Sequence, residues 1–342
     1  MQTVTSPSTQ EMERRTRRGD RSWPVPFRSS NGRRPRVRKV HNAGDFIFRN
    51  ITRIFAILVF SLVFVMAYEM YMGSGLTLQK FGWSFLWTET WDPVQGTFGA
   101  LPFIYGTVVS SLIALIISLP LSLGVAIFLS ELAPRWLEQP LSFLVELLAA
   151  IPSIVYGLWG IFVMVPWLRV SVQPLLKKYF GTLPLFQGPA YGFSMLAAGV
   201  ILAIMILPII TSISRDVLKA IPTLQREAAL GLGATRWETT KLILMGARSG
   251  ILGATLLGFG RAIGETMAVT MVIGNRPEIA ASLFSPATSM ASVIANEFAE
   301  ATTDLYTDAL IEVALILFGV TIILNILARL IVWSTTRRFA AT

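Results

Sequence analysis

The sequence predicts an all-α membrane protein with six transmembrane helices, both of whose termini are cytoplasmic. Of its 342 residues 53% are hydrophobic and only 14% are charged, whereas a soluble domain usually carries about 25% charged residues. Six apolar runs are each long enough to cross a hydrocarbon core about 30 Å thick. They must be helical, because lipid offers no hydrogen-bond partners to an open backbone. The runs cover residues 54–72, 103–129, 141–165, 195–213, 250–273 and 308–333.

The distribution of basic residues predicts the orientation. The amino-terminal tail, the second-to-third and fourth-to-fifth connections and the carboxyl end together hold 23 of the 29 Lys and Arg residues. The opposite side holds five, and Arg261 lies within a run. Because Lys and Arg accumulate on the cytoplasmic side, we expect both termini there.

Residues 1–50 form a basic tail rich in Ser, Pro and Arg, which predicts a disordered cytoplasmic segment. The simplest interpretation of this tail is a solvated segment that binds no partner. Contact with anionic lipid is an alternative, and a nucleic-acid role is disfavoured. The first apolar run begins about 50 residues in, so we expect a membrane anchor and no cleavable signal peptide.

Composition excludes several kinds of chemistry. The chain has no cysteine and a single histidine, His41, in the tail, so we expect no disulfide, metal site or histidine relay in the bundle. No nucleophile–base pattern is present, and GxxxxGK[ST], the phosphate-binding loop of many ATPases, is absent. The sequence therefore predicts a protein that is not an enzyme and needs no cofactor.

Two outer connections are unusual. Residues 81–91 are dense in aromatic side chains, which favour the headgroup level of a bilayer, so we expect this segment at the outer interface. Residues 282–298 are too polar to span the membrane. Whether they dip into the bundle is left open.

The cytoplasmic connection 214–249 is much longer than the two to eight residues typical of bundles. Pro222 suits the start of a short helix, and Gly231 and Gly233 end it. Thr235 and Glu238 then form a capping box that starts a second helix. This elbow either caps the end of the bundle or is a rigid element against which a partner pushes.

The fifth run carries two opposite charges, Arg261 and Glu265. Its nine strongly apolar residues favour insertion by about 3 to 5 kcal/mol, while Arg261 costs about 3 kcal/mol and Glu265 about as much. The run therefore cannot face lipid on all sides. Gly260 and Gly264 would let another helix approach closely.

Arg261 and Glu265 are four residues apart, so on one helix they would share a face and pair. Two roles stay open: an ion pair that locks helix packing, or an anion site in which the carboxylate keeps binding weak enough for release. Glu146, in the third run, is a further expected buried carboxylate and an alternative partner for Arg261.

Several stretches resemble the permease subunits of binding-protein-dependent ABC importers. Glu227-Ala228-Ala229, then Gly233, then Ile243 match the start of that family's cytoplasmic loop, whereas Met245 and Gly246 depart from its Leu-Pro end. The stretches 146–160, 260–269 and 282–301 narrow the likeness to phosphate importers. The resemblance runs from about residue 51 to the carboxyl end.

The resemblance implies a type I ABC importer permease fold in a bacterial inner membrane, with no ATP hydrolysis in this chain. It divides the chain into the tail (1–50), a first transmembrane helix with an outer interfacial segment (51–102), the permease domain (103–333) and a cytoplasmic end (334–342). Its implied partners are inorganic phosphate, the second permease subunit PstA, a dimer of the ATPase PstB, the phosphate-binding protein PstS and the lipid bilayer.

The resemblance also assigns residues. Arg261, Glu265 and Glu146 are expected along the substrate pathway, and Glu227, Ala228, Ala229 and Gly233 at the ATPase contact. A solvated Glu227 paired with Arg226 is the alternative there. Two other functions stay open: a transporter driven by an ion gradient, with Glu146 and Glu265 as proton carriers, or a membrane sensor that transports nothing. The residues alone do not separate phosphate from sulfate or molybdate.

Overall fold

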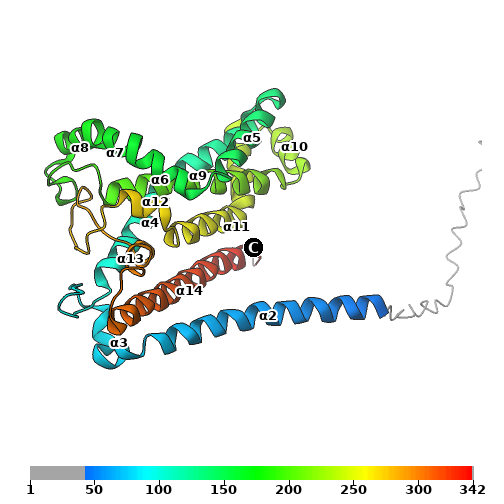
Figure 1. Cartoon of the computed structure of the whole chain (residues 1–342). Coiled ribbons are helices and arrows are strands. Elements are labelled where there is room, and N and C mark those ends of the chain that lie inside the picture. Colours follow the sequence, from blue (N-terminus) through cyan, green and yellow to red (C-terminus); the bar gives the residue numbers. More distant parts are fainter. Residues whose placement is uncertain (1–42, 341–342) are drawn as a thin grey trace, which may run out of the picture. The chain divides into compact units, whose positions relative to one another are not determined.

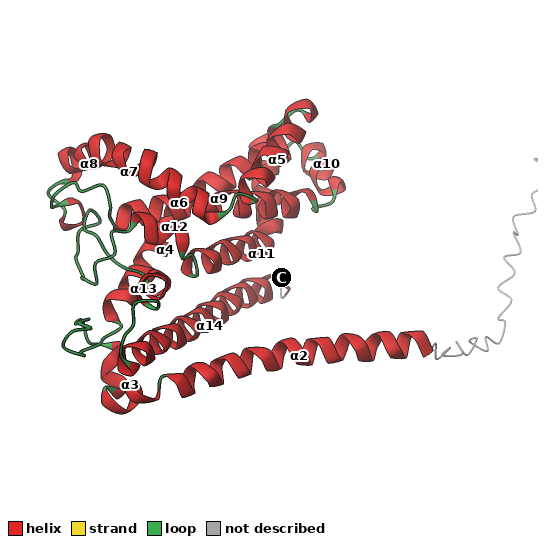
Figure 2. Cartoon of the chain, in the orientation of Figure 1, coloured by secondary structure: helices red, strands yellow, loops and turns green. Residues whose placement is uncertain are grey.

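The computed structural model describes residues 43–340, so the prediction of a disordered tail falls largely outside the described residues. Within them the chain is helical, and no β-strand occurs in the part that the structure describes (Figure 2). Two isolated bridges, Asp92 with Thr97 and Gly274 with Ala287, are the extended pairings.

Most of the helical elements follow one another with short connections, and the longer ones cover residues 87–100 and 273–289 (Figure 1). In chain order they are α2 (Ala43–Gly73), α3 (Gly75–Lys80), η1 (Gly82–Leu86), α4 (Leu101–Ile127), η2 (Phe128–Leu132), α5 (Arg135–Ala149), α6 (Ser153–Trp159), η3 (Gly160–Met164), α7 (Val165–Trp167), η4 (Leu168–Val172), α8 (Gln173–Phe180), η5 (Pro184–Phe186), α9 (Met195–Lys219), α10 (Thr223–Gly231), α11 (Arg236–Ile263), α12 (Met267–Val272), α13 (Met290–Glu297) and α14 (Asp304–Ala340).

Six of these stretches are long and apolar enough to cross a membrane, which confirms the predicted number. They are Phe46–Gly73, Leu101–Leu132, Ser153–Phe180, Met195–Lys219, Arg236–Ile263 and Asp304–Leu327.

The predicted position of the third span, residues 141–165, was wrong, because the observed span is Ser153–Phe180. Residues 141–149 belong to α5, a separate helix that ends at Ala149. Pro152 follows in an extended conformation, with ψ of 142°, and α6 begins after it. Because Ile151 precedes a proline, helical backbone is disfavoured there. The span from α6 to α8 then continues through two π-helical turns on either side of Pro166.

The chain divides into two compact units, residues 1–59 and 60–342. Helix α2 crosses this boundary as one continuous helix. In the first unit, the apolar side chains of 46–59 are exposed. In the second unit the apolar side chains of 60–72 are also largely exposed, as suits a helix surrounded by lipid.

The core of the second unit lies where α4, α9 and α11 pack together. Small residues bring these helices close. A Cβ added at Gly199 would overlap Ile113 of α4, and one added at Gly258 would lie 2.7 Å from Ile210 of α9. This close approach through glycine is typical of packed membrane helices.

A second cluster joins η1, the start of α4, α13 and the start of α14. The aromatic segment 81–91 buries some of its side chains and exposes others: Phe85 is buried, whereas Trp83 and Trp87 are exposed. The 282–298 segment is packed inside the protein, because Met290 and Val293 of α13 are fully buried and the Met290 N–H donates to Thr107 Oγ1 of α4 at 2.8 Å. This answers the question left open above.

Candidate functional site

The fifth span is interrupted where its two charges lie. Helix α11 ends at Ile263, and α12 begins at Met267 after Gly264, Glu265 and Thr266. The prediction of one run from 250 to 273 was therefore wrong in its continuity. Gly264 is a poor helix former and Thr266 ranks low, although Glu265 between them favours a helix. The break places Arg261 in the last turn of α11 and Glu265 outside any helix.

Arg261 is exposed on the surface of this chain. Within residues 43–340 its guanidinium has no carboxylate within 4.0 Å. On the same helix, Gly253 and Leu257 are exposed two turns and one turn before Arg261, and a Cβ added at Gly253 would meet nothing within 4 Å. This face of α11 is open.

Glu265 does not form the predicted ion pair with Arg261. Its carboxylate turns instead to the start of α12, where Oε1 accepts a hydrogen bond from the Ala268 N–H at 3.4 Å. The prediction rested on a continuous helix, and the break removes the shared face. The two charges stay neighbours along the chain without direct contact.

Glu146 was expected to be buried in a span, and it is neither. It lies on α5, its side chain is 55% exposed, and Oε1 accepts from Arg215 Nη2 at 3.0 Å. Arg215, near the end of α9, also donates to Asp216. Glu146 therefore joins α5 to α9, and its pairing with Arg261 does not occur in this structure.

The elbow has the predicted form. Helix α10 ends at Gly231, and Gly233 has a φ of +85°, a value that costs other residues about 1 kcal/mol or more. The Thr235 hydroxyl accepts from the Glu238 N–H, while the Glu238 carboxylate accepts from the Thr235 N–H at 2.8 Å. Helix, glycine bend and helix are confirmed, although α9 and α11 extend into the expected loop and leave residues 220–235 between them.

The outer surface of the elbow combines charge and apolar side chains. Glu227 and Ala228 are exposed, Ala229 is partly exposed, and Gly233 is exposed at the bend. Leu232 is 90% exposed, and Leu224 and Leu230 are also exposed. Exposed leucines beside a charge on a short rigid helix are typical of a surface that another protein covers.

Arg226 holds the inner side of the elbow, a role that the sequence analysis missed. Its Nε and Nη2 donate to the two oxygens of Glu131 in η2 at 3.2 and 2.8 Å. Its other donors reach the carbonyl oxygens of Ile221 and Leu218 at the end of α9. The alternative in which Arg226 neutralises Glu227 is therefore wrong. The partners are 95 residues apart, so one sequence gives no signal of this pairing.

A second missed residue is Glu312 in α14. It is 4% exposed, and its Oε2 has no hydrogen-bond partner in the described structure. An acid within a long apolar run was the signal available, and Glu312 lies one turn after Asp308, the other acid of the run 308–333. Among the residues that the structure describes, no three His, Cys, Asp or Glu side chains lie together so as to hold a metal ion.

Comparison with known families places these features in context. Residues 118–337 match the family described as "Binding-protein-dependent transport system inner membrane component". The matched region contains the elbow, the broken fifth span and α14.

The chain belongs to this family.

Curated relatives of this permease agree with the assignment. A "Phosphate transport system permease protein PstC" of Mesorhizobium japonicum is 51% identical over 83% of this chain and 89% of its own length. The protein of the same name from Pasteurella multocida is 48% identical over 85% of this chain and 92% of its own length. The "Probable phosphate transport system permease protein PstC" of Methanocaldococcus jannaschii is 37% identical over 80% of this chain and 89% of its own length.

A solved structure shares the fold of this permease. The MetNI methionine ABC transporter in an inward-facing conformation matches 68% of this chain and 94% of the solved chain, with a TM-score of 0.51 and 18% identity. The fold of a type I ABC permease and the membership of the family together make this a multi-pass protein of the inner membrane.

Proposed function

We propose that the chain is the transmembrane subunit of an ATP-driven importer of inorganic phosphate and forms half of its translocation pathway. The relatives at 45–51% identity carry the name of a phosphate permease subunit, which supports the substrate class. The excess of Lys and Arg at both ends and in the fourth-to-fifth connection supports cytoplasmic termini.

The observation that carries the pathway proposal is the setting of Arg261. A guanidinium at the depth of a span costs about 3 kcal/mol unless it is compensated. Here it lies at a helix break, with no carboxylate in contact in the described part of the chain. The planar fork of Arg suits two oxygens of a phosphate. Glu265, on the same break, limits how tightly an anion binds, so release remains possible.

The open face of α11 is the proposed contact with the second permease subunit, PstA. Gly253, which is exposed, leaves room for a helix from outside the chain. A pathway between two subunits would place Arg261 at their boundary, where the phosphate released by PstS passes through the bilayer.

The elbow is the proposed contact with the ATPase PstB. The chain has no phosphate-binding loop of its own, so ATP must be hydrolysed elsewhere. Glu227, Ala228 and Ala229 would meet the ATPase together with the exposed leucines, and the bend at Gly233 would set the angle of α10.

Uptake of labelled phosphate tests the pathway, measured beside the amount of assembled complex. We expect Arg261→Gln to abolish uptake while the complex still assembles. Glu265→Gln should let phosphate bind but slow its release. Arg169→Gln, which removes an exposed cation elsewhere, is the matched control. Full transport by the double variant Arg261→Gln, Glu265→Gln would show that the two residues act only on packing.

An importer driven by an ion gradient is the competing function, with Glu265 as a proton carrier. The structure gives this alternative little support. A gradient-driven importer would use Glu146 as its second proton carrier, but Glu146 lies outside the spans and pairs with Arg215. ATP depletion should stop uptake, whereas an uncoupler should leave it intact as long as ATP is maintained. The reverse result would favour the gradient.

A further inference from the structure

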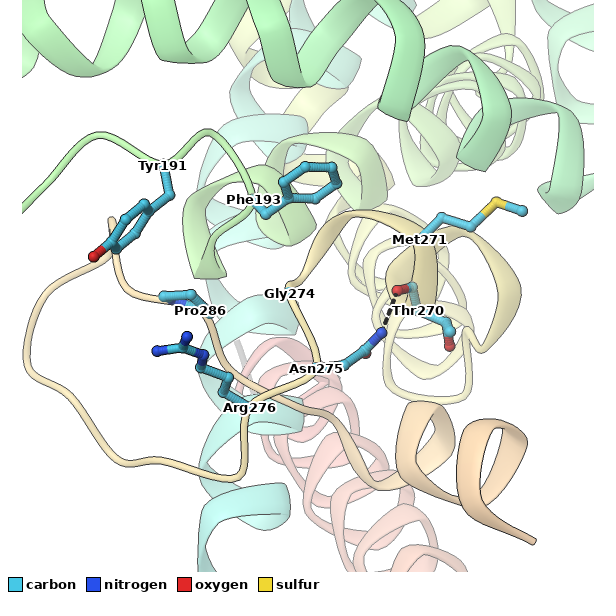
Figure 3. Close-up of a pocket in the computed structure, with 8 residues that line it drawn as sticks. All are labelled: Tyr191, Phe193, Thr270, Met271, Gly274, Asn275, Arg276 and Pro286. Carbon is cyan, nitrogen blue, oxygen red and sulfur yellow. Dashed lines mark hydrogen bonds between the residues drawn. The ribbon is translucent and has the colours of Figure 1, made fainter. Parts of the chain in front are cut away.

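A pocket of about 400 Å³ lies beside the amino-terminal end of α9 (Figure 3). Tyr191 and Phe193 line it from the segment before α9, and Thr270 comes from α12. Asn275 and Arg276 line it from the turn that follows α12. Arg276 is the charged residue of the lining, and in Figure 3 its guanidinium lies next to Pro286, on the same side of the pocket as Tyr191.

Backbone hydrogen bonds fix the walls of this pocket. The Ser194 N–H donates to the Val272 oxygen at 3.2 Å, and the Ala287 N–H donates to the Ile273 oxygen at 3.1 Å. The Arg276 N–H in turn donates to the Ala287 oxygen at 3.2 Å. Three separate segments of the chain are therefore joined around the cavity, so it is preformed.

The turn that presents Arg276 has an unusual backbone. Gly274 and Asn275 have φ values of +99° and +51°, and Asn275 is the one non-glycine residue with positive φ in the described structure. The Asn275 side chain holds this conformation by donating to the Thr270 oxygen at 2.9 Å (Figure 3). A strained conformation that the surroundings maintain is typical of functional sites.

The electrostatics of the pocket favour an anion. No carboxylate lines it, and Arg276 has no ion-pair partner within 4.0 Å among the residues described. The Tyr191 hydroxyl adds a second donor. A guanidinium with a free fork beside a hydroxyl matches the oxygens of a tetrahedral oxyanion.

The position of the pocket relates it to the pathway. Helix α9, with 25 residues, separates it from the elbow by about 36 Å, so the two lie at opposite ends of a span. Helix α12 has six residues, about 9 Å, with Glu265 before its first turn and Arg276 soon after its last. An anion that leaves the pocket along α12 reaches the break that holds Arg261 and Glu265.

We propose that this pocket is an outer subsite at which Arg276 and Tyr191 bind inorganic phosphate before it reaches Arg261. The proposal rests on the proposed function and its orientation, and adds to them a second oxyanion site in the same chain. Arg276 and Arg261 then act in sequence at the two ends of α12.

Arginine modification tests the subsite directly. The purified importer complex, free of phospholipid in detergent, is treated with phenylglyoxal with and without inorganic phosphate, and labelled arginines are mapped by mass spectrometry. We expect phosphate to protect Arg276 and to leave Arg135, an exposed cation at the start of α5, labelled as before. Absence of labelling at Arg276 without phosphate, or absence of protection with it, would overturn the proposal.

A lipid headgroup carries the same phosphate chemistry, so the labelling is repeated in phosphatidylcholine nanodiscs. Protection by lipid together with no protection by free phosphate in detergent would refute a substrate subsite. In transport, Arg276→Gln should raise the phosphate concentration needed for half-maximal uptake roughly tenfold, as expected for the affinity lost with one charge-assisted contact, and Arg276→Lys should reverse part of this rise. If Arg276→Gln transports normally while Arg261→Gln does not, the subsite is wrong and the proposed function stands.

Discussion

The substitution Arg226→Met tests whether the elbow is held to the membrane helices by a single side chain. Methionine keeps much of the apolar volume and removes every donor. Four hydrogen bonds are lost: two to Glu131 and one each to the oxygens of Leu218 and Ile221. Glu131, whose side chain is 11% exposed, then loses its cation.

The magnitude follows from this burial. Removing one partner of a fully buried ion pair costs about 3 to 5 kcal/mol. Arg226 keeps 20% of its side chain exposed, so water compensates part of the loss, and we expect about 2 to 3 kcal/mol. Since about 1.4 kcal/mol corresponds to a factor of ten, the elbow should open about 30 to 150 times more often.

Hydrogen–deuterium exchange of the α10 amides measures this opening in the full importer. Exchange through local unfolding reports the free energy of that segment separately from the rest of the protein. Arg236→Met is the matched control, because Arg236 is exposed and no ion pair of its side chain occurs within residues 43–340. The exchange rate of the α10 amides in Arg226→Lys should lie between those of the wild type and Arg226→Met, since lysine keeps the positive charge but loses the planar set of donors of the guanidinium.

Unchanged exchange in α10 of Arg226→Met would refute the reasoning. A double-mutant cycle with Glu131→Leu gives a second check, because the coupling between the two side chains should account for most of the effect. A coupling near zero would mean that the elbow is held by its other contacts.

Three further outcomes are expected. Gly233→Val should insert normally but lose its ATPase on co-purification, because a Cβ there meets nothing yet φ is +85°; Gly231→Ala is the control, and retention of the ATPase with normal transport would exclude a coupling role. Gly106→Ala should reduce the amount of folded protein in the membrane, because the added Cβ overlaps the backbone oxygen of Thr288, whereas Gly124→Ala on the same helix adds a Cβ in open space and should not. The purified chain alone should show no ATPase activity, and specific photolabelling by an ATP analogue would contradict that division of labour.

The apolar runs predicted the number of spans because hydropathy reports how much of a helix avoids water. It does not report where a helix breaks. Residues 141–165 read as one run, although Pro152 divides α5 from α6. The same limitation hid the interruption at Gly264–Thr266, and with it the separation of Arg261 from Glu265.

The elbow was predictable because its signals are local: two glycines and a capping box within a few residues. The contacts that anchor it are distant in sequence, as Arg226 and Glu131 show. The same holds for Glu146, whose partner Arg215 is 69 residues away. The charged residues of the site could be identified from the sequence, but their pairings could be identified only from the folded structure.

The open face of α11 also bears on the cost of leaving the subunit unassembled. A copy without the proposed second subunit turns Arg261 and the backbone of Gly253 toward lipid, at a cost of about 3 kcal/mol for the arginine alone. Assembly that covers Arg261 would remove this cost, so the charge proposed for the passage of an anion would also favour pairing of the two subunits.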